Sequence, residues 1–281
     1  MAQSPEMLLT RLSAQLQRSN GYQARAEIER LLAPLRDDPK RLEPYGLKVY
    51  SQNDEDGILE EIFRRLGVTT GRFVEIGVEN GLECNTLYLL HKGWRGAWVE
   101  GDPKRKAEIE GKFGSVLDRR LVLAMGMVTA ENINQLFKDL GATEDLDLLS
   151  MDVDGNEIYL LESMAIRPKV LCLEYNAKFP PHLAKQQVYN PRRAWDGSDY
   201  MGSSLKSLTD SAARKGYRLV GTNITGANAF FVRDDLAGDH FPGVASPEHL
   251  YNPPRYWLWN DHFVNIGHRP DFGPYVDLLA D

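Results

Sequence analysis

Two hydrophobic periods alternate along the middle of the chain. Short runs such as "LDLLSM" (146–151) and "KVLCLE" (169–174) are apolar at most positions, and they are separated by segments such as "NINQLFKDL" (132–140), with apolar residues three and four apart. The first pattern is typical of strands covered on both faces, and the second of helices. Strands that alternate with crossover helices predict a parallel sheet with helices on both sides.

The last two predicted strands break this alternation. "YRLVGT" (217–222) and "NAFFVR" (228–233) are joined by only five residues, "NITGA". Such a connection is too short for a helical crossover and fits a hairpin, so the final strand should run antiparallel to its neighbours. The predicted fold class is α/β, with a doubly wound, mostly parallel seven-stranded sheet that ends in an antiparallel hairpin.

Both ends of the chain differ from this central body. Residues 4–35 carry leucines, alanines and isoleucine at helical spacing that is interrupted near "SNG", which predicts a helical hairpin packed outside the body. The expected divisions are a helical N-terminal extension (1–47), the α/β domain (48–235) and an aromatic-rich tail or lid (236–281). The tail contains the aromatic cluster "RYWLWNDHF". Instead of a lid, this cluster could form the contact between the subunits of a homo-oligomer.

Composition narrows the class of protein. The chain has 281 residues, 42% of them hydrophobic and 26% charged, as expected for a folded domain with a sizeable core. A net charge of −7 argues against nucleic acid as a partner. Cys84 and Cys172, the two cysteines, form no short-spaced motif, and we find neither a signal peptide nor an apolar membrane span. We expect a cytoplasmic protein with a small-molecule substrate and no membrane partner.

The stretch "RFVEIGVENG" (72–81) is the first candidate for a binding site. Glu75 lies near the end of a predicted strand, and Gly77 and Gly81 bracket the turn that follows. The middle glycine of the dinucleotide motif G-x-G-x-x-G is missing, and Glu79 stands where a pyrophosphate would need room. Negative charge here favours a cation, such as the sulfonium or amino group of S-adenosylmethionine. A simple turn between strand and helix is the alternative.

A second carboxylate ends the next predicted strand. Glu100 lies about 20 residues beyond the glycine turn, a position from which an acidic side chain accepts both hydroxyls of a ribose. Asp102 should cap the helix that follows, which leaves Glu100 and its neighbour Gly101 for the cofactor. Met127, after the third strand, would form an apolar wall for adenine, although core packing explains a methionine equally well.

Oxygen ligands follow the fourth and fifth predicted strands. Asp152 and Asp154 come after "LLSM", and Glu174 and Asn176 come at and after the end of "VLCLE". These strand ends should open on the same edge of the sheet as the glycine turn, so the side chains could hold magnesium or another hard cation. Helix capping and a structural hydrogen-bond network are the alternatives.

A general base is harder to locate. His182 follows the fifth strand and has a side chain whose pKa range suits proton removal near neutral pH. Asp154 is the other candidate for this catalytic role. The histidines of the tail, His240, His249, His262 and His268, would reach the site only if the tail folded over it.

Several motifs together resemble the FkbM-like branch of class I S-adenosylmethionine-dependent methyltransferases. They are "YSQNDEDG", "FVEIGVENGLECNTL", "WRGAWVEGD", "LLSMDVDGNE", "LEYN" and "NAFFVR", which cover approximately residues 48–235. The resemblance implies a Rossmann-like methyltransferase fold and O-methylation of a small-molecule or sugar hydroxyl. It also implies a methyl donor bound at Glu75, Gly77, Gly81 and Glu100, with Ser51 and Gln52 reaching the site.

The glycine spacing is also similar to that of metal-dependent catechol O-methyltransferases. That similarity implies Asp152 and Glu174 as ligands of a divalent cation, with Asn176 third. Tyr175 stands between the acid and the asparagine, which departs from that type and puts Asn176 in doubt. A non-catalytic cofactor-binding or scaffold protein, or an enzyme that uses S-adenosylmethionine for other chemistry, stay open as alternatives.

Overall fold

The computed structural model describes residues 4–244, 246–259 and 268–276. Its main sheet has seven strands in the order β3-β2-β1-β4-β5-β8-β7. All neighbours pair parallel except β8, which is antiparallel to β5 and β7, so the predicted fold class is confirmed. The strands are β1 (Arg72–Ile76), β2 (Arg95–Glu100), β3 (Leu121–Met125), β4 (Leu148–Met151), β5 (Val170–Glu174), β7 (Tyr217–Thr222) and β8 (Asn228–Arg233).

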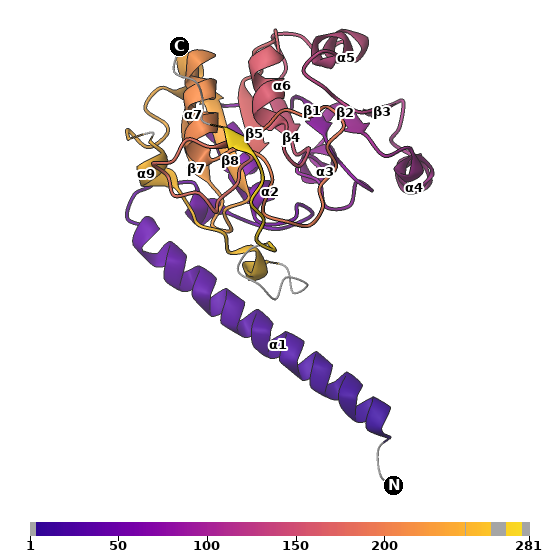
Figure 1. Ribbon diagram of the computed structural model, residues 1–281, viewed down its shortest axis with the longest axis vertical. Coiled ribbons are helices and arrows are strands. Elements are labelled where there is room, and N and C mark those ends of the chain that lie inside the picture. The colour runs from indigo at the N-terminus through magenta and orange to yellow at the C-terminus, as the bar shows by residue number, and fades with distance from the viewer. Residues whose placement is uncertain (1–3, 245, 260–267, 277–281) are drawn as a thin grey trace.

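Helices cover both faces of this sheet (Figure 1). Each face has its own apolar core, to which the helices contribute their buried stripes and the strands every second side chain. Strand order reverses between β1 and β4, which is where open α/β sheets bind ligands. One face carries α2 (Glu55–Arg65), α3 (Leu87–His91) and α4 (Lys106–Phe113); the other carries α5 (Ile133–Asp139), α6 (Glu157–Ser163) and α7 (Leu205–Arg214).

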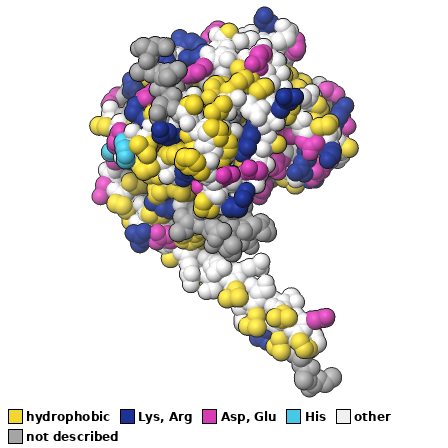
Figure 2. Space-filling model, viewed as in Figure 1, with side chains coloured by type: hydrophobic (Ala, Val, Ile, Leu, Met, Phe, Trp, Pro, Cys, Tyr) yellow, Lys and Arg dark blue, Asp and Glu magenta, His cyan; other side chains and the backbone are white. Residues whose placement is uncertain are grey.

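The predicted N-terminal hairpin is wrong. Residues Pro5–Leu32 form one continuous helix, α1, that projects from the body (Figure 1). Gly21 lies in its middle without a positive φ, because one glycine costs a helix only about 1 kcal/mol and does not end it. Only its last turns are buried, through Ala24, Ile28 and Leu32, while Figure 2 shows hydrophobic side chains exposed along the projecting part.

The C-terminal tail folds back onto the body in short elements. Tyr275–Val276 (β9) pairs antiparallel with Gln186–Gln187 (β6), a strand in the loop after β5. The tail also contains α8 (Asp234–Ala237), α9 (Pro247–Leu250) and the 3-10 helix η4 (Tyr256–Leu258). Three further 3-10 helices are η1 (Ala33–Leu35), η2 (Glu43–Tyr45) and η3 (Pro103–Arg105). His262 lies outside the described residues.

Within the described part of the chain, no helix is long and apolar enough to cross a membrane.

Gly77 allows the ends of β1 and β4 to meet closely. Its φ is +86°, and a Cβ at this position would lie 1.7 Å from the carbonyl oxygen of Asp152. The neighbouring Asp152 N–H donates to the Ile76 carbonyl at 3.0 Å. A side chain at residue 77 would therefore separate the two loops that form the candidate site.

We predict that Gly77→Ala lowers the free energy of unfolding by about 3 kcal/mol, because it adds a backbone clash to left-handed strain. Gly93→Ala is the matched control, since Gly93 has a φ of +92° but its Cβ would meet only Thr70 Cγ2, at 4.0 Å. The control should cost about 1 kcal/mol. Equal losses in urea unfolding of the two variants would contradict the close approach.

Candidate functional site

A cavity of about 440 Å³ opens at the carboxyl ends of β1, β2, β4 and β5. It lies beside the point where strand order reverses. Most of the residues predicted from the sequence line it, although they come from six separate segments. They are Gln52, Gly77, Glu100, Gly101, Met127, Asp152, Asp154 and Glu174, and Glu79 lines it as well.

The first turn of α2 holds Gln52 and Asn53 at the cavity. One carboxylate oxygen of Asp56 accepts the backbone N–H groups of residues 49, 50 and 51, at 2.6 to 2.9 Å. Glu55 accepts from Asn53 and also from the side-chain amides of Asn223 and Asn228 at the β7–β8 hairpin. The motif "SQNDED" therefore folds as a rigid wall of the cavity, with Ser51 itself buried behind it.

Glu100 lies at the rim of the cavity and organises its backbone. Its two carboxylate oxygens accept the N–H groups of Asp102 and Glu79, each at 2.7 Å. Asp102 in turn accepts from Lys104 N at 3.0 Å and caps η3, so the capping role expected of Asp102 is present. A carboxylate has about four acceptor positions, so Glu100 can still accept two ribose hydroxyls.

Glu75 and Gly81 do not line the cavity. The buried Glu75 carboxylate accepts from Asn85 N at 2.7 Å, Thr86 N at 3.0 Å and Thr86 Oγ1 at 2.5 Å, and so it fixes the loop before α3. Burial raises the pKa of Glu75 to about 7. At Gly81 a Cβ would meet the rings of Trp98 and Phe113. Both residues shape the turn beside the cavity.

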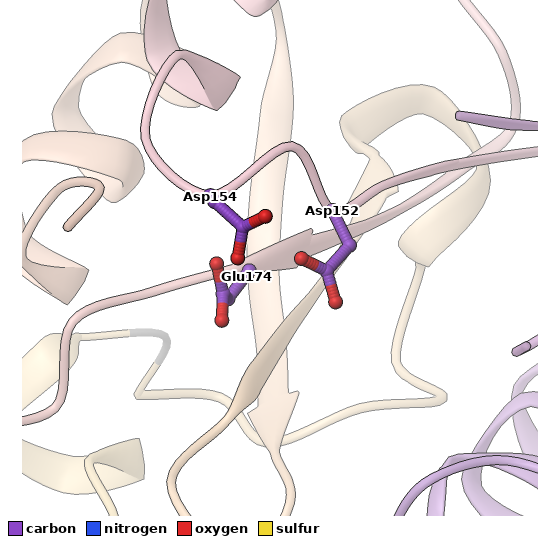
Figure 3. A group of neighbouring side chains, drawn as sticks. All are labelled: Asp152, Asp154 and Glu174. Carbon is purple, nitrogen blue, oxygen red and sulfur yellow. The ribbon is translucent and has the colours of Figure 1, made fainter. Parts of the chain in front are cut away.

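Three carboxylates from two strand ends point toward one another (Figure 3). Asp152 and Asp154 follow β4, and Glu174 ends β5. One oxygen from each lies within 4.8 Å of the other two. Asp154 has a φ of +57°, a left-handed conformation that directs its side chain back over the strand ends. Asp154 was predicted both among the oxygen ligands and as a candidate base, and it lies in the carboxylate cluster.

The cluster is electrostatically strained, although Arg193 at the cavity wall lowers the pKa of Asp154 in part. Burial, and then the charges of neighbouring acids, hold the pKa values of Asp152 and Glu174 well above their usual range. Burial raises the pKa of Asp154 to about 6, with Glu79 adding to the shift. Burial likewise raises the pKa of Glu157, directly behind the cluster, to about 7.

Two predicted residues lie away from this cluster. The Asn176 amide donates to the carbonyls of Asp199 and Met201, each at 2.8 Å, and its oxygen accepts from Lys178 N. Asn176 is buried in these contacts and does not line the cavity. His182 is exposed on the loop after β5 and does not line the cavity either.

A roof over the cavity comes from parts of the chain that carry no periodic signal. Arg193 and Trp195 belong to the long loop after β5, and Tyr256 and His268 to the tail. The His268 ring contacts the rings of Trp195 and Tyr256, with centroids 4.8 and 4.9 Å apart. The aromatic motif "RYWLWNDHF" was the one sequence signal for this roof, and it did not show which residues reach the cavity.

Two chemically different halves thus share the cavity. Glu100, Gly101 and Met127 form a half suited to a nucleoside, with the Met127 thioether packed against the Gly101 backbone. Asp152, Asp154 and Glu174 form a half with hard oxygen donors, which suit magnesium, manganese or calcium. Buried Glu174 Oε2 has no hydrogen-bond partner among the described residues, as expected of an oxygen that lacks its counter-ion.

No protein-family model matches the chain, and no curated protein sequence matches it either. Solved structures of methyltransferases do show a distant likeness. An O-methyltransferase from Bacillus cereus in complex with SAH has 15% identity and a TM-score of 0.41, over 74% of this chain and 89% of that one.

Two further structures have a similar degree of likeness. The O-methyltransferase TomG from Streptomyces achromogenes has 14% identity and a TM-score of 0.39, over 76% of this chain and 89% of that one. The N-terminal domain of EvdMO1, with SAH and D-fucose, has 16% identity and a TM-score of 0.42, over 74% and 94%. Likeness at this level assigns neither activity nor substrate to this chain.

The raised carboxyl pKa values predict a pH dependence of stability. Between about pH 4.5 and pH 7 the folded protein binds more protons than the unfolded chain, so the free energy of unfolding should fall as the pH rises. Asp154→Asn removes one of these groups. The free energy of unfolding of this variant should fall less with rising pH than that of the wild type. In metal-free buffer the difference between the two should grow in favour of the variant by on the order of 1 to 2 kcal/mol from pH 5 to pH 8.

Urea unfolding at the two pH values measures this difference. Asp139→Asn, on an exposed helix end, is the matched control and should follow the wild type at both. An Asp154→Asn variant that tracks the control would contradict the strain assigned to the cluster.

Proposed function

We propose that this protein is an S-adenosylmethionine-dependent O-methyltransferase of the FkbM-like branch of class I, and that a divalent cation takes part in acceptor binding. One observation carries the proposal: the three converging carboxylates lie in the same cavity as Glu100 and the glycine turn. Methyl transfer requires a donor site and an acceptor site in contact, and two adjoining groups of side chains in one cavity support this proposal.

The charge of the cavity supports the choice of donor. Glu79, Glu100 and Asp102 line the half suited to a nucleoside, and each would repel a pyrophosphate. The same carboxylates attract the sulfonium and amino groups of S-adenosylmethionine. Glu100 would accept the ribose hydroxyls, and Met127 would cover one face of the adenine.

The donor set of the other half fits a divalent cation. Asp152, Asp154 and Glu174 supply three carboxylate oxygens at separations that one ion can bridge, and a positive charge would relieve their mutual repulsion. A bound divalent cation would supply a Lewis acid that lowers the pKa of an acceptor hydroxyl. Asp154 then acts as a ligand and no longer needs to remove the proton itself.

The remaining work of catalysis is alignment. Methyl transfer is an in-line displacement at the methyl carbon, with the donor sulfur as the leaving group. The protein must therefore hold an acceptor oxygen opposite the carbon–sulfur bond and exclude water. Trp195, Tyr256 and His268 cover the cavity on the acceptor side and provide flat apolar surfaces for a ring or sugar. We infer an acceptor with two adjacent oxygens, such as a vicinal diol, a catechol or a hydroxy acid.

Glu100→Gln should weaken binding of SAH about tenfold, because it replaces charged hydrogen bonds to the ribose by neutral ones. Isothermal titration calorimetry measures the change directly. Glu108→Gln, on α4 away from the cavity, is the control and should bind like the wild type. Failure of the wild type to bind SAH or S-adenosylmethionine at millimolar concentration would refute the donor site.

Mn²⁺ should bind the SAH-saturated protein at one site, which electron paramagnetic resonance can count as bound ion. Asp154→Asn and Glu174→Gln should each lower the affinity at least tenfold, because each removes a charged ligand. Asn176→Ala should not, since its amide is held by Asp199 and Met201. Mn²⁺ binding that survives both acid variants would remove the carboxylate cluster from this role.

A further inference from the structure

A second cleft lies at the opposite edge of the sheet from the carboxylate cluster. Its volume is about 170 Å³, and it opens where β1, β2 and β3 begin. The two sites therefore lie at opposite ends of the parallel strands, and a five-residue strand is about 16 Å long. Four arginines line this cleft: Arg72, Arg95, Arg119 and Arg120.

The register of the sheet brings two of these arginines directly together. Arg72 and Arg95 are paired residues on the parallel strands β1 and β2, so their side chains leave the same face about 4.8 Å apart. Like charges placed opposite each other destabilise a sheet. Arg119 and Arg120 enter the same cleft from the turn that precedes β3.

The protein compensates little of this positive charge itself. Arg72 donates to the Gly141 carbonyl at 2.8 Å, and its guanidinium lies 3.9 Å from the exposed Asp145 carboxylate. The Asp147 carboxylate accepts the Arg72 backbone N–H at 2.7 Å and is itself paired with Lys169. Arg120 donates to the Leu90 carbonyl at 3.2 Å.

Within the described residues, the ion pairs of the protein include neither Arg95 nor Arg119. Asp118 is the one acidic residue among those that line the cleft. Four arginines against one lining acid give the cleft an excess of positive charge, which is unexpected in a chain whose net charge is −7.

The floor of the cleft is apolar. Val74, Ala97 and Val122 come from the sheet, and Val122 is 47% exposed although it is a large hydrophobic residue on a strand. Leu140 and Leu146 add an apolar wall. A ligand for this cleft therefore carries negative charge for the arginine rim and a compact apolar or planar part for the floor.

We propose that this cleft binds a small phosphate ester, with the phosphate on the arginines and its organic group on the floor. A guanidinium group presents two parallel N–H donors that match two phosphate oxygens, which is why arginine clusters favour phosphate. A volume of about 170 Å³ accommodates one phosphoryl group and a small ring. The inference is independent of the methyltransferase proposal, because no residue of the cleft belongs to the other cavity.

Calorimetry with phenyl phosphate and inorganic phosphate as probes tests the proposal. Full-length protein is titrated at low ionic strength with excess SAH present, so that the larger cavity is occupied if it binds SAH. We expect phenyl phosphate to bind at one site, several-fold more tightly than inorganic phosphate, and to weaken as salt is added. The double variant Arg95→Ala/Arg119→Ala should lose at least tenfold in affinity.

A matched control removes two arginines elsewhere. Arg18→Ala/Arg25→Ala takes the same charge from the exposed helix α1 and should leave phosphate binding unchanged. Without ligand, the Arg95→Ala/Arg119→Ala variant should unfold at the same temperature as the wild type or at a higher one, because removal of two arginines relieves repulsion in the cleft. The proposal would be overturned if neither probe bound, or if both double variants weakened binding equally. It would also be overturned if a short single-stranded RNA bound more tightly than phenyl phosphate.

Discussion

Repulsion among the carboxylates at the ends of β4 and β5 is the constraint on which the rest of the site depends. Asp152, Asp154 and Glu174 lie together at one cavity, and burial first, then the charges of neighbouring acids, raises their pKa values. Such an arrangement costs stability unless something positive enters it. A sequence selected for stability alone would replace these acids by amides, so their presence points to a cationic ligand.

The sheet makes this arrangement possible. Parallel strands bring their carboxyl ends to one edge, and the reversal of strand order between β1 and β4 leaves an opening there. Gly77 then allows the β4 loop to approach within a distance that no side chain would permit. The starts of the same strands gather arginines at the other edge, so one sheet separates a negative site from a positive one.

Much of this architecture could be predicted from the sequence, because apolar strands and helical spacing are local signals. The strand ends also located Glu100, Asp152 and Glu174 at the cavity. The prediction of an N-terminal hairpin was wrong because a long helix tolerates the residues "SNG" in its middle.

The directions of side chains and the contacts between distant segments could not be predicted from the sequence. The sequence favoured Asn176 over Asp154 as the third metal ligand, yet a left-handed turn directs Asp154 into the cluster and two backbone carbonyls hold Asn176 away from it. The contact between Trp195 and His268 joins segments far apart in the chain, and no periodicity reports such a contact.

The central claim is that one cavity holds a nucleoside cofactor and a divalent cation side by side. A crystal structure of the protein grown with SAH and Mn²⁺, with anomalous scattering recorded for manganese, tests it most directly. We expect a manganese peak among Asp152, Asp154 and Glu174, with the SAH ribose on Glu100 and its sulfur facing the ion across the cavity. A manganese peak elsewhere, or SAH absent from this cavity, would contradict it.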